Sequence, residues 1–191
     1  MSLRELYIGC RTYRRFLQEP VPVEVMTAIL ENVRIMSCGR NGQVLRFYAV
    51  MQTDTVAAMQ GLVHWAASLP PEIGVPKPGQ QPTAFLVITK PAGAAGFTDV
   101  DVGIAADRIC ASAWEFGFGS CMMGAIDGKG IARLLRIPES EEVRLAVALG
   151  KPSHKSTVTA PPADGNLSYY VDDKLDYYVP KLPLTEIARF R

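Results

Sequence analysis

The chain has 191 residues, of which 48% are hydrophobic and 20% charged, so one full-sized domain with a substantial core is expected. Its formal net charge of +1 gives no reason to expect nucleic acid or an anionic membrane surface as a partner. Arg4, Arg11 and Arg14 interrupt the start of the chain, and no long apolar run follows. We therefore expect neither a signal peptide nor a membrane-spanning segment, and take a cytoplasmic location as the default.

The N-terminal region combines two helix patterns with a basic cluster. A short helix is expected over 2–9, and the apolar spacing predicts an amphipathic helix over 23–35. Between them lies CRTYRRF, residues 10–16, with three arginines and a threonine hydroxyl. Guanidinium and hydroxyl groups are the donors that phosphate oxygens accept. A solvated basic surface is the alternative interpretation.

The next part of the chain alternates loops with regular elements. The loop SCGRNGQ, residues 37–43, presents amide groups that either meet a ligand or form a simple turn. A strand is expected over 44–51 and a helix over 53–69. The segment 72–82 is rich in proline and glycine and is a candidate lid. The continuous apolar run over 83–89 predicts a strand buried on both faces.

The segment TDVDVGIAADRICASAWEFGFGSCMMG, residues 98–124, is the organising unit of the sequence. Apolar residues on nearly all sides predict a helix over 99–117 that is buried in a large core or against a partner chain. Thr98 and Asp101 have the spacing of a capping box at its start, and Gly117 is expected to end it. A short buried strand over 118–124 is then expected.

The last third begins with regular elements and changes composition after them. A helix is expected over 127–136 and a strand over 143–149. From Lys151 the residues are mainly Pro, Ser, Thr and Gly, which predicts an extended arm over about 151–191, with a short helix at 183–190. The order of elements favours an α+β or α/β fold around a small sheet.

The cysteines and histidines do not form a recognisable site. The spacing of Cys10, Cys38, Cys110 and Cys121 is not that of a metal site, and buried free thiols are favoured over metal or disulfide roles. His64 and His154 have no serine or cysteine partner in a known motif, so we disfavour a hydrolase and expect both to be structural or exposed. No metal site is predicted.

Several separated segments resemble, in order, the FMN-dependent nitroreductase family. CRTYRRF with EPVP resembles the family's basic opening, and SCGRNGQ resembles its Ser-rich loop. DVGIAADRICASAWEFGFGSCMMG is similar to its central dimer helix and the strand behind it. RLLRIPESEEVRLAVALGKP and YYVPKLPL resemble its C-terminal part. The resemblance extends over nearly the whole chain.

The resemblance implies an architecture and a set of ligand-binding residues. The fold would be a single α+β domain, a three-layer sandwich with a central, mostly antiparallel sheet, in an intertwined homodimer with FMN at the subunit interface. Arg14 would face the N1/O2 edge of the flavin, where negative charge grows on reduction. The other implied contacts are Arg11, Thr12 and Lys181 for the phosphate, Asn41 and Gln43 for the FMN of the other subunit, and backbone amides of Met123 and Gly124 near N5.

The implied activity is that of an NADH- or NADPH-dependent flavin oxidoreductase. It would reduce nitroaromatic, quinone or similar electron-poor small molecules by ping-pong hydride transfer, and because the chemistry is the cofactor's we name no catalytic residue. Cys10 and Leu182 stand where the family usually has arginines. Two alternatives stay open: a specialised relative that dehalogenates or cleaves flavin, and a flavin-binding or flavin-free paralogue without reductase activity.

Overall fold

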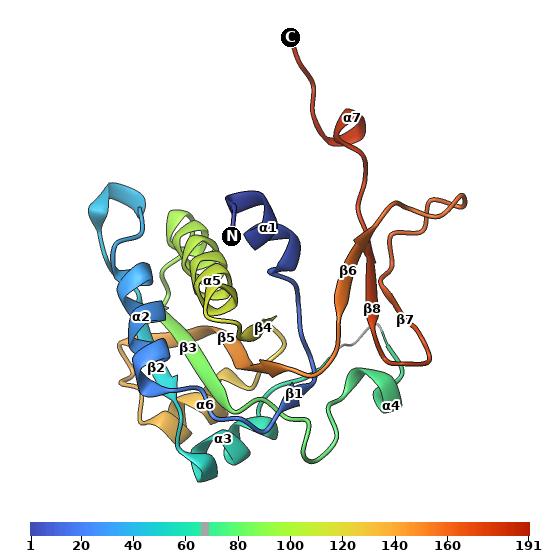
Figure 1. Cartoon of the computed structure of the whole chain (residues 1–191). Helices are drawn as coiled ribbons and strands as arrows, with labels where there is room; N and C mark the ends of the chain where they lie inside the picture. Colours follow the sequence, from blue (N-terminus) through green and yellow to red (C-terminus); the bar gives the residue numbers. More distant parts are fainter. Residues whose placement is uncertain (66–68) are drawn as a thin grey trace.

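A central antiparallel sheet organises the molecule (Figure 1). In the computed structural model, which describes residues 1–65 and 69–191, its strands are β1 (Phe16–Leu17), β2 (Arg46–Val50), β3 (Ala84–Pro91), β4 (Gly119–Met123) and β5 (Glu141–Pro152). Their order is β1-β5-β3-β2, with β4 also paired to β5. Each of these pairings is antiparallel, as the resemblance implied.

Helices cover both faces of this sheet. The longest are α2 (Val23–Arg34) and α5 (Phe97–Glu115), which pack together on one face beside α1 (Leu3–Gly9). On the other face lie α3 (Thr53–Gln60) and α6 (Gly128–Leu135). The described ranges also contain three short helical turns: η1 (Gly39–Asn41), α4 (Pro71–Gly74) and α7 (Leu184–Ile187). The three-layer α+β arrangement is therefore confirmed.

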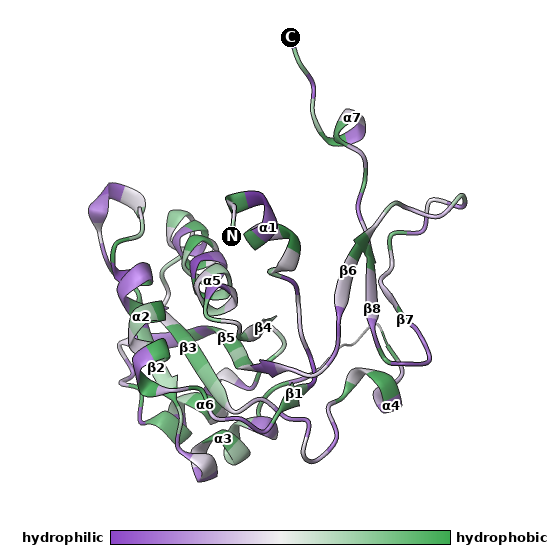
Figure 2. Ribbon diagram, viewed as in Figure 1, coloured by the Kyte–Doolittle hydropathy of each residue, from purple (hydrophilic) through white to green (hydrophobic). Residues whose placement is uncertain are grey.

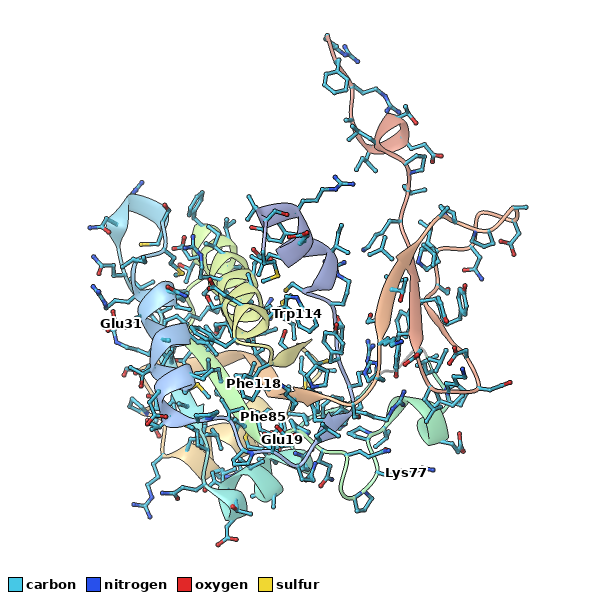
Figure 3. The ribbon with its side chains drawn as sticks, viewed as in Figure 1. Glu19, Glu31, Lys77, Phe85, Trp114 and Phe118 are labelled. Atoms are coloured by element: carbon cyan, nitrogen blue, oxygen red, sulfur yellow. The ribbon has the colours of Figure 1, made fainter. Side chains whose placement is uncertain are left out.

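Strand β3 separates two hydrophobic cores. Leu86 and Ile88 belong to the core shared with α2 and α5, whereas Phe85 and Val87 belong to the core shared with α3 and α6. This alternation follows from the two-residue repeat of a strand. Hydrophobic residues accordingly concentrate on the central strands, and Phe85 lies in the middle of the sheet (Figures 2 and 3). The expectation of a strand buried on both faces is confirmed.

Helix α5 begins two residues earlier than expected, and the expected capping box is wrong. Gly96 is the N-cap, with φ of 69°. The carboxylate of Asp101 instead accepts a hydrogen bond of 2.9 Å from the backbone N–H of Gly39, and so joins α5 to η1. The other end agrees with the sequence, because Gly117 adopts a φ of 77° just after the helix. Glycine takes this left-handed conformation without the steric cost that a Cβ brings.

Two further expectations need correction. The helix expected over 53–69 ends at Gln60, and Val63 then forms an antiparallel bridge with Ile126, which draws the chain away from the helix axis. Residues 66–68 lie outside the described part of the chain. The candidate lid at 72–82 begins inside the helical turn α4, which corrects its first residues, whereas 75–82 has neither helix nor strand, as expected. Its role as a lid stays a prediction.

The arm after β5 contains a small sheet of its own. Its strands are β6 (Ser156–Thr159), β7 (Tyr170–Val171) and β8 (Tyr177–Pro180), in the order β6-β8-β7. Beyond β8 the chain leads through α7 away from the rest of the subunit (Figure 1). Phe190 near its end is 89% exposed. No helix in the described ranges has both the length and the apolar character needed to cross a membrane.

Candidate functional site

The basic N-terminal segment is bound along strand β4. Thr12 and Ser120 form a parallel bridge, and the backbone N–H of Tyr13 donates to the carbonyl of Ser120 at 2.8 Å. The Tyr13 ring lies directly over Gly119, where an added Cβ would come within 2.8 Å of ring atoms. Glycine at 119 therefore allows the close approach. This pairing fixes the backbone position of the neighbouring arginines relative to β4.

A small cavity opens between this segment, α5 and β4. Its volume is about 180 Å³. It is lined by Cys10, Arg11, Thr12, Asp107, Cys110, Ser120 and Met122, and is called the Arg11 cavity below. Arg11 donates from Nη2 to the carbonyl of Tyr7 at 2.7 Å. Its buried Nε has no hydrogen-bond partner among the described residues, so this donor remains available for a ligand.

The thiols beside the cavity remain protonated near neutral pH. Burial raises the pKa of Cys110 to about 12 and that of Cys121 to about 11. Burial also raises the pKa of Cys10, although the charge of Arg11 opposes the shift. Nucleophilic attack and metal ligation require a thiolate. The cavity is therefore better suited to binding a ligand than to thiol chemistry, which agrees with the interpretation of the cysteines as free thiols.

The methionine whose side chain faces the cavity is Met122, which the sequence analysis did not select. Met122 is 50% exposed, whereas Met123 is buried in the core shared with α3 and α6. Only the backbone of Met123 is therefore available to a ligand. Gly124 follows at the exposed end of the strand. The alternation of a strand over 119–123 places the two methionines on opposite faces, but it does not decide which of them faces the cavity.

Arg14 lies near β4, but its guanidinium contacts the arm. The charge of Arg14 reaches Cys121, where it opposes the rise in that thiol's pKa. Its guanidinium carbon lies 4.7 Å from the centre of the Tyr169 ring and 5.2 Å from that of Tyr177. Its backbone N–H donates to Nε2 of His154 at 3.1 Å. His154 thus makes a structural contact, which is one of the two roles, structural or exposed, that were expected for it.

The loop with Asn41 and Gln43 is strained and lies apart from the Arg11 cavity. Arg40, Asn41 and Gln43 adopt φ values of 53°, 53° and 49°. Left-handed backbone costs a residue with a Cβ about 1–2 kcal/mol. Such strain concentrates at functional sites, where it is part of the mechanism. Within one subunit Gln43 lines a different groove, of about 370 Å³, beside α2 and β2.

Lys181 also lies apart from the Arg11 cavity. It is exposed and follows β8 directly, and its backbone N–H donates to the carbonyl of Thr159 at 2.9 Å. One subunit therefore brings Arg11 and Thr12 together with Ser120 and Met122 of β4. Among the described residues, the cavity lining does not include the other predicted contacts: Met123, Gly124, Asn41, Gln43 and Lys181.

The site is built from the basic segment, β4 and α5, and all three lie in a part of the chain that matches a single protein family. The model of the nitroreductase family matches residues 9–151. The chain belongs to the nitroreductase family. The match includes the Arg11 cavity, the strained loop and Arg14, and it ends where β5 passes into the arm. No curated protein is significantly similar to this nitroreductase in sequence.

Solved structures share the nitroreductase fold at low sequence identity. A nitroreductase family protein from Clostridium difficile 630 is 17% identical, with a TM-score of 0.69 over 100% of this chain and 98% of that one. A nitroreductase family protein from Clostridium novyi NT is 18% identical, with a TM-score of 0.68 over 80% and 86%. The NADPH:FMN oxidoreductase from Vibrio harveyi, complexed with NAD+, is 19% identical, with a TM-score of 0.64 over 84% and 74%.

Proposed function

We propose that this nitroreductase is an FMN-dependent NAD(P)H oxidoreductase that reduces nitroaromatic compounds, quinones or similar electron-poor small molecules. The proposal rests on two arginine N–H groups near β4 that have no hydrogen-bond partner among the described residues. Arg11 and Arg14 both hold a buried Nε without a partner in the described chain. Arg11 shares its cavity with the exposed Met122, and the charge of Arg14 reaches Cys121 of the same strand. Buried donors of this kind are normally satisfied, and a bound anionic ligand would satisfy them.

The residues present fit FMN. Arg11 and the exposed Thr12 offer guanidinium and hydroxyl donors of the kind that phosphate oxygens accept. The Arg11 cavity is smaller than the roughly 300–1,000 Å³ typical of ligand sites. One subunit therefore supplies only part of the site. We expect the site to be completed by Asn41 and Gln43 of the partner subunit and by Lys181 of the arm.

The protein's own residues would bind and polarise the cofactor. FMN, when bound, supplies the redox chemistry itself. The positive charge of Arg14 would favour the reduced, anionic flavin over the oxidised, neutral one, so its effect is differential and not only on affinity. The backbone N–H groups near Met123 and Gly124 would donate to the ring. Nicotinamide and acceptor are expected to use one face in turn, which predicts parallel double-reciprocal lines in steady-state kinetics.

We also infer that the functional unit is a homodimer formed through α5. One side of α5 is buried in the subunit, and the other side lines an open groove of about 780 Å³ with α1. Val100 on that side is 49% exposed. At Gly103 an added Cβ would meet nothing within 4 Å, so a second helix can approach closely there. Leu3 on the α1 side of the groove is 67% exposed as well, and exposed apolar side chains along a groove are typical of interfaces between subunits.

Titration of flavin fluorescence tests the function directly. Arg11→Ala and Lys181→Ala are each expected to weaken FMN binding about tenfold, because a charge-assisted hydrogen bond contributes about 1.5–3 kcal/mol. Arg4→Ala is the matched control, since Arg4 is exposed on α1 and does not line the cavity. Wild-type protein that binds no FMN would contradict the proposal and favour a flavin-free paralogue.

A further inference from the structure

Three side chains of the arm region surround Arg14. Tyr169 and Tyr177 present their rings to its guanidinium at 4.7 and 5.2 Å, and His154 accepts its backbone N–H at 3.1 Å. We call Tyr169, Tyr177 and His154 the arm cage. The cage residues are separated from Arg14 by more than half of the chain, so their approach depends on the arm being docked against the subunit.

The arm cage is itself held firmly. Tyr177 is only 1% exposed, and its ring lies 4.7 Å from that of His154. Nδ1 of His154 lies 2.9 Å from the carbonyl of Lys155, while Nε2 faces the N–H of Arg14. This geometry selects the neutral tautomer in which Nδ1 donates and Nε2 accepts. The histidine therefore fixes the backbone of Arg14, and the tyrosines fix its side chain.

Arg15 binds the same part of the arm through backbone carbonyls. Its guanidinium donates to the carbonyl of Ile73 at 3.0 Å and to the carbonyl of Leu175. It also lies 5.4 Å from the centre of the Tyr177 ring. The two adjacent arginines thus have different roles. Arg15 ties the arm to α4, and Arg14 is the side chain that the docked arm orients.

Aromatic rings hold a cation without cancelling its charge. None of the ion pairs among the described residues includes Arg14. A carboxylate in the place of the tyrosines would hold the guanidinium equally well, but it would offset the positive field that the guanidinium exerts on a neighbouring ligand. Cation–π contacts contribute about 0.5–2 kcal/mol each, enough to restrict a long flexible side chain.

We propose that Tyr169 and Tyr177 are positioning residues for Arg14. They hold an uncancelled positive charge near Cys121 of β4, and the reduction potential of the bound flavin therefore depends on the docked arm of the same subunit. The inference rests on the proposed function, because it requires FMN beside Arg14. It adds to that function a role for the arm that extends beyond a phosphate contact from Lys181.

The test compares neighbouring tyrosines of the arm. Tyr169→Leu removes a ring from Arg14, whereas Tyr170→Leu removes a ring that stacks on Tyr178 at 5.1 Å and does not contact Arg14. The measured quantity is the ratio of dissociation constants for oxidised and reduced FMN, obtained from the reduction potentials of free and bound flavin. Tyr169→Leu is expected to shift this ratio three- to tenfold against reduced FMN. A tenfold shift corresponds to a potential lower by about 30 mV.

Two further variants separate positioning from a general effect on folding. Tyr169→Phe keeps the ring and is expected to restore the wild-type potential. In an Arg14→Ala background, Tyr169→Leu is expected to add no further shift, because the charge that it positions is already gone. Equal potentials in Tyr169→Leu and wild type, with FMN bound to both, would overturn the inference and leave the proposed function standing. If the wild-type protein fails to bind FMN, both the inference and the proposed function are contradicted.

Discussion

The neutral histidine of the arm cage makes a specific prediction about stability and pH. Burial, followed by the neighbouring charges of Arg15 and Arg14, lowers the pKa of His154 from 6.5 to about 4, although Asp176 and the carbonyl of Lys155 oppose the shift. The rings of Tyr13 and Tyr177 pack against its imidazole at centroid distances of 5.3 and 4.7 Å, although the imidazole also borders an open groove of about 430 Å³. The unfolded chain therefore binds a proton at this residue more readily than the folded chain does.

The sign of the effect follows from linkage. Between pH 6.5 and about 4 the unfolded state carries the extra proton, so the free energy of unfolding falls as the pH falls through this window. The stabilisation is complete above the unfolded pKa. At pH 5 the unfolded histidine is mostly protonated and the folded one mostly neutral, which corresponds to a loss of about 2 kcal/mol relative to pH 7.

Urea denaturation of the cofactor-free protein at pH 7 and pH 5 measures this loss. The matched variant is His154→Gln, whose amide can still accept the N–H of Arg14 but does not titrate. Wild type should lose about 2 kcal/mol more than the variant between the two pH values. Carboxylates with lowered pKa values, such as Asp99 and Glu142, are common to both proteins and cancel in the comparison. Protein concentration is kept equal because dimerisation contributes to stability. The same loss in both proteins would refute the reasoning.

Three other predictions concern the interface, the strained loop and the cationic side chain. Gly103→Arg should yield folded monomers that bind FMN poorly, whereas the exposed control Gly61→Arg should stay dimeric. Light scattering measures the mass of each variant and circular dichroism shows that it is folded. A dimeric Gly103→Arg would exclude this interface. Gln43→Gly should raise the free energy of unfolding by about 0.5–1 kcal/mol, because it releases more strain than glycine costs, yet weaken FMN binding; a loss of stability would refute this. Arg14→Ala should lower the potential of bound flavin and slow its reduction at saturating FMN, and an unchanged potential would make Arg14 only an anchor.

Local patterns predicted most of the framework correctly. The continuous apolar run that became β3 and the helix ended by Gly117 are encoded by residues close in sequence, so they were predictable. The capping box at Thr98 failed because Asp101 found a tertiary partner in Gly39, sixty-two residues earlier. The helix over 53–69 ended early because Val63 pairs with Ile126. In both cases a distant contact overrode a local preference, and one sequence does not reveal such contacts.

The site was predicted less completely than the fold. The family resemblance selected the basic segment and the end of β4, and the structure brings Arg11 and Thr12 beside that strand. It did not select Met122, because the face of a strand depends on its register with its neighbours. Nor did it indicate that Arg14 lies against tyrosines far along the chain. The roles of Asn41, Gln43 and Lys181 depend on a second subunit and remain predictions.

Anaerobic titration of the FMN-loaded protein with NADH and with NADPH tests the central claim most directly. The visible absorbance of the oxidised flavin is recorded before and after the nicotinamide, and again after a quinone or nitroaromatic compound is added. The account predicts that at least one nicotinamide bleaches the bound flavin and that the acceptor restores its absorbance. Bound flavin that stays oxidised with both nicotinamides, or protein that takes up no FMN at all, would contradict it.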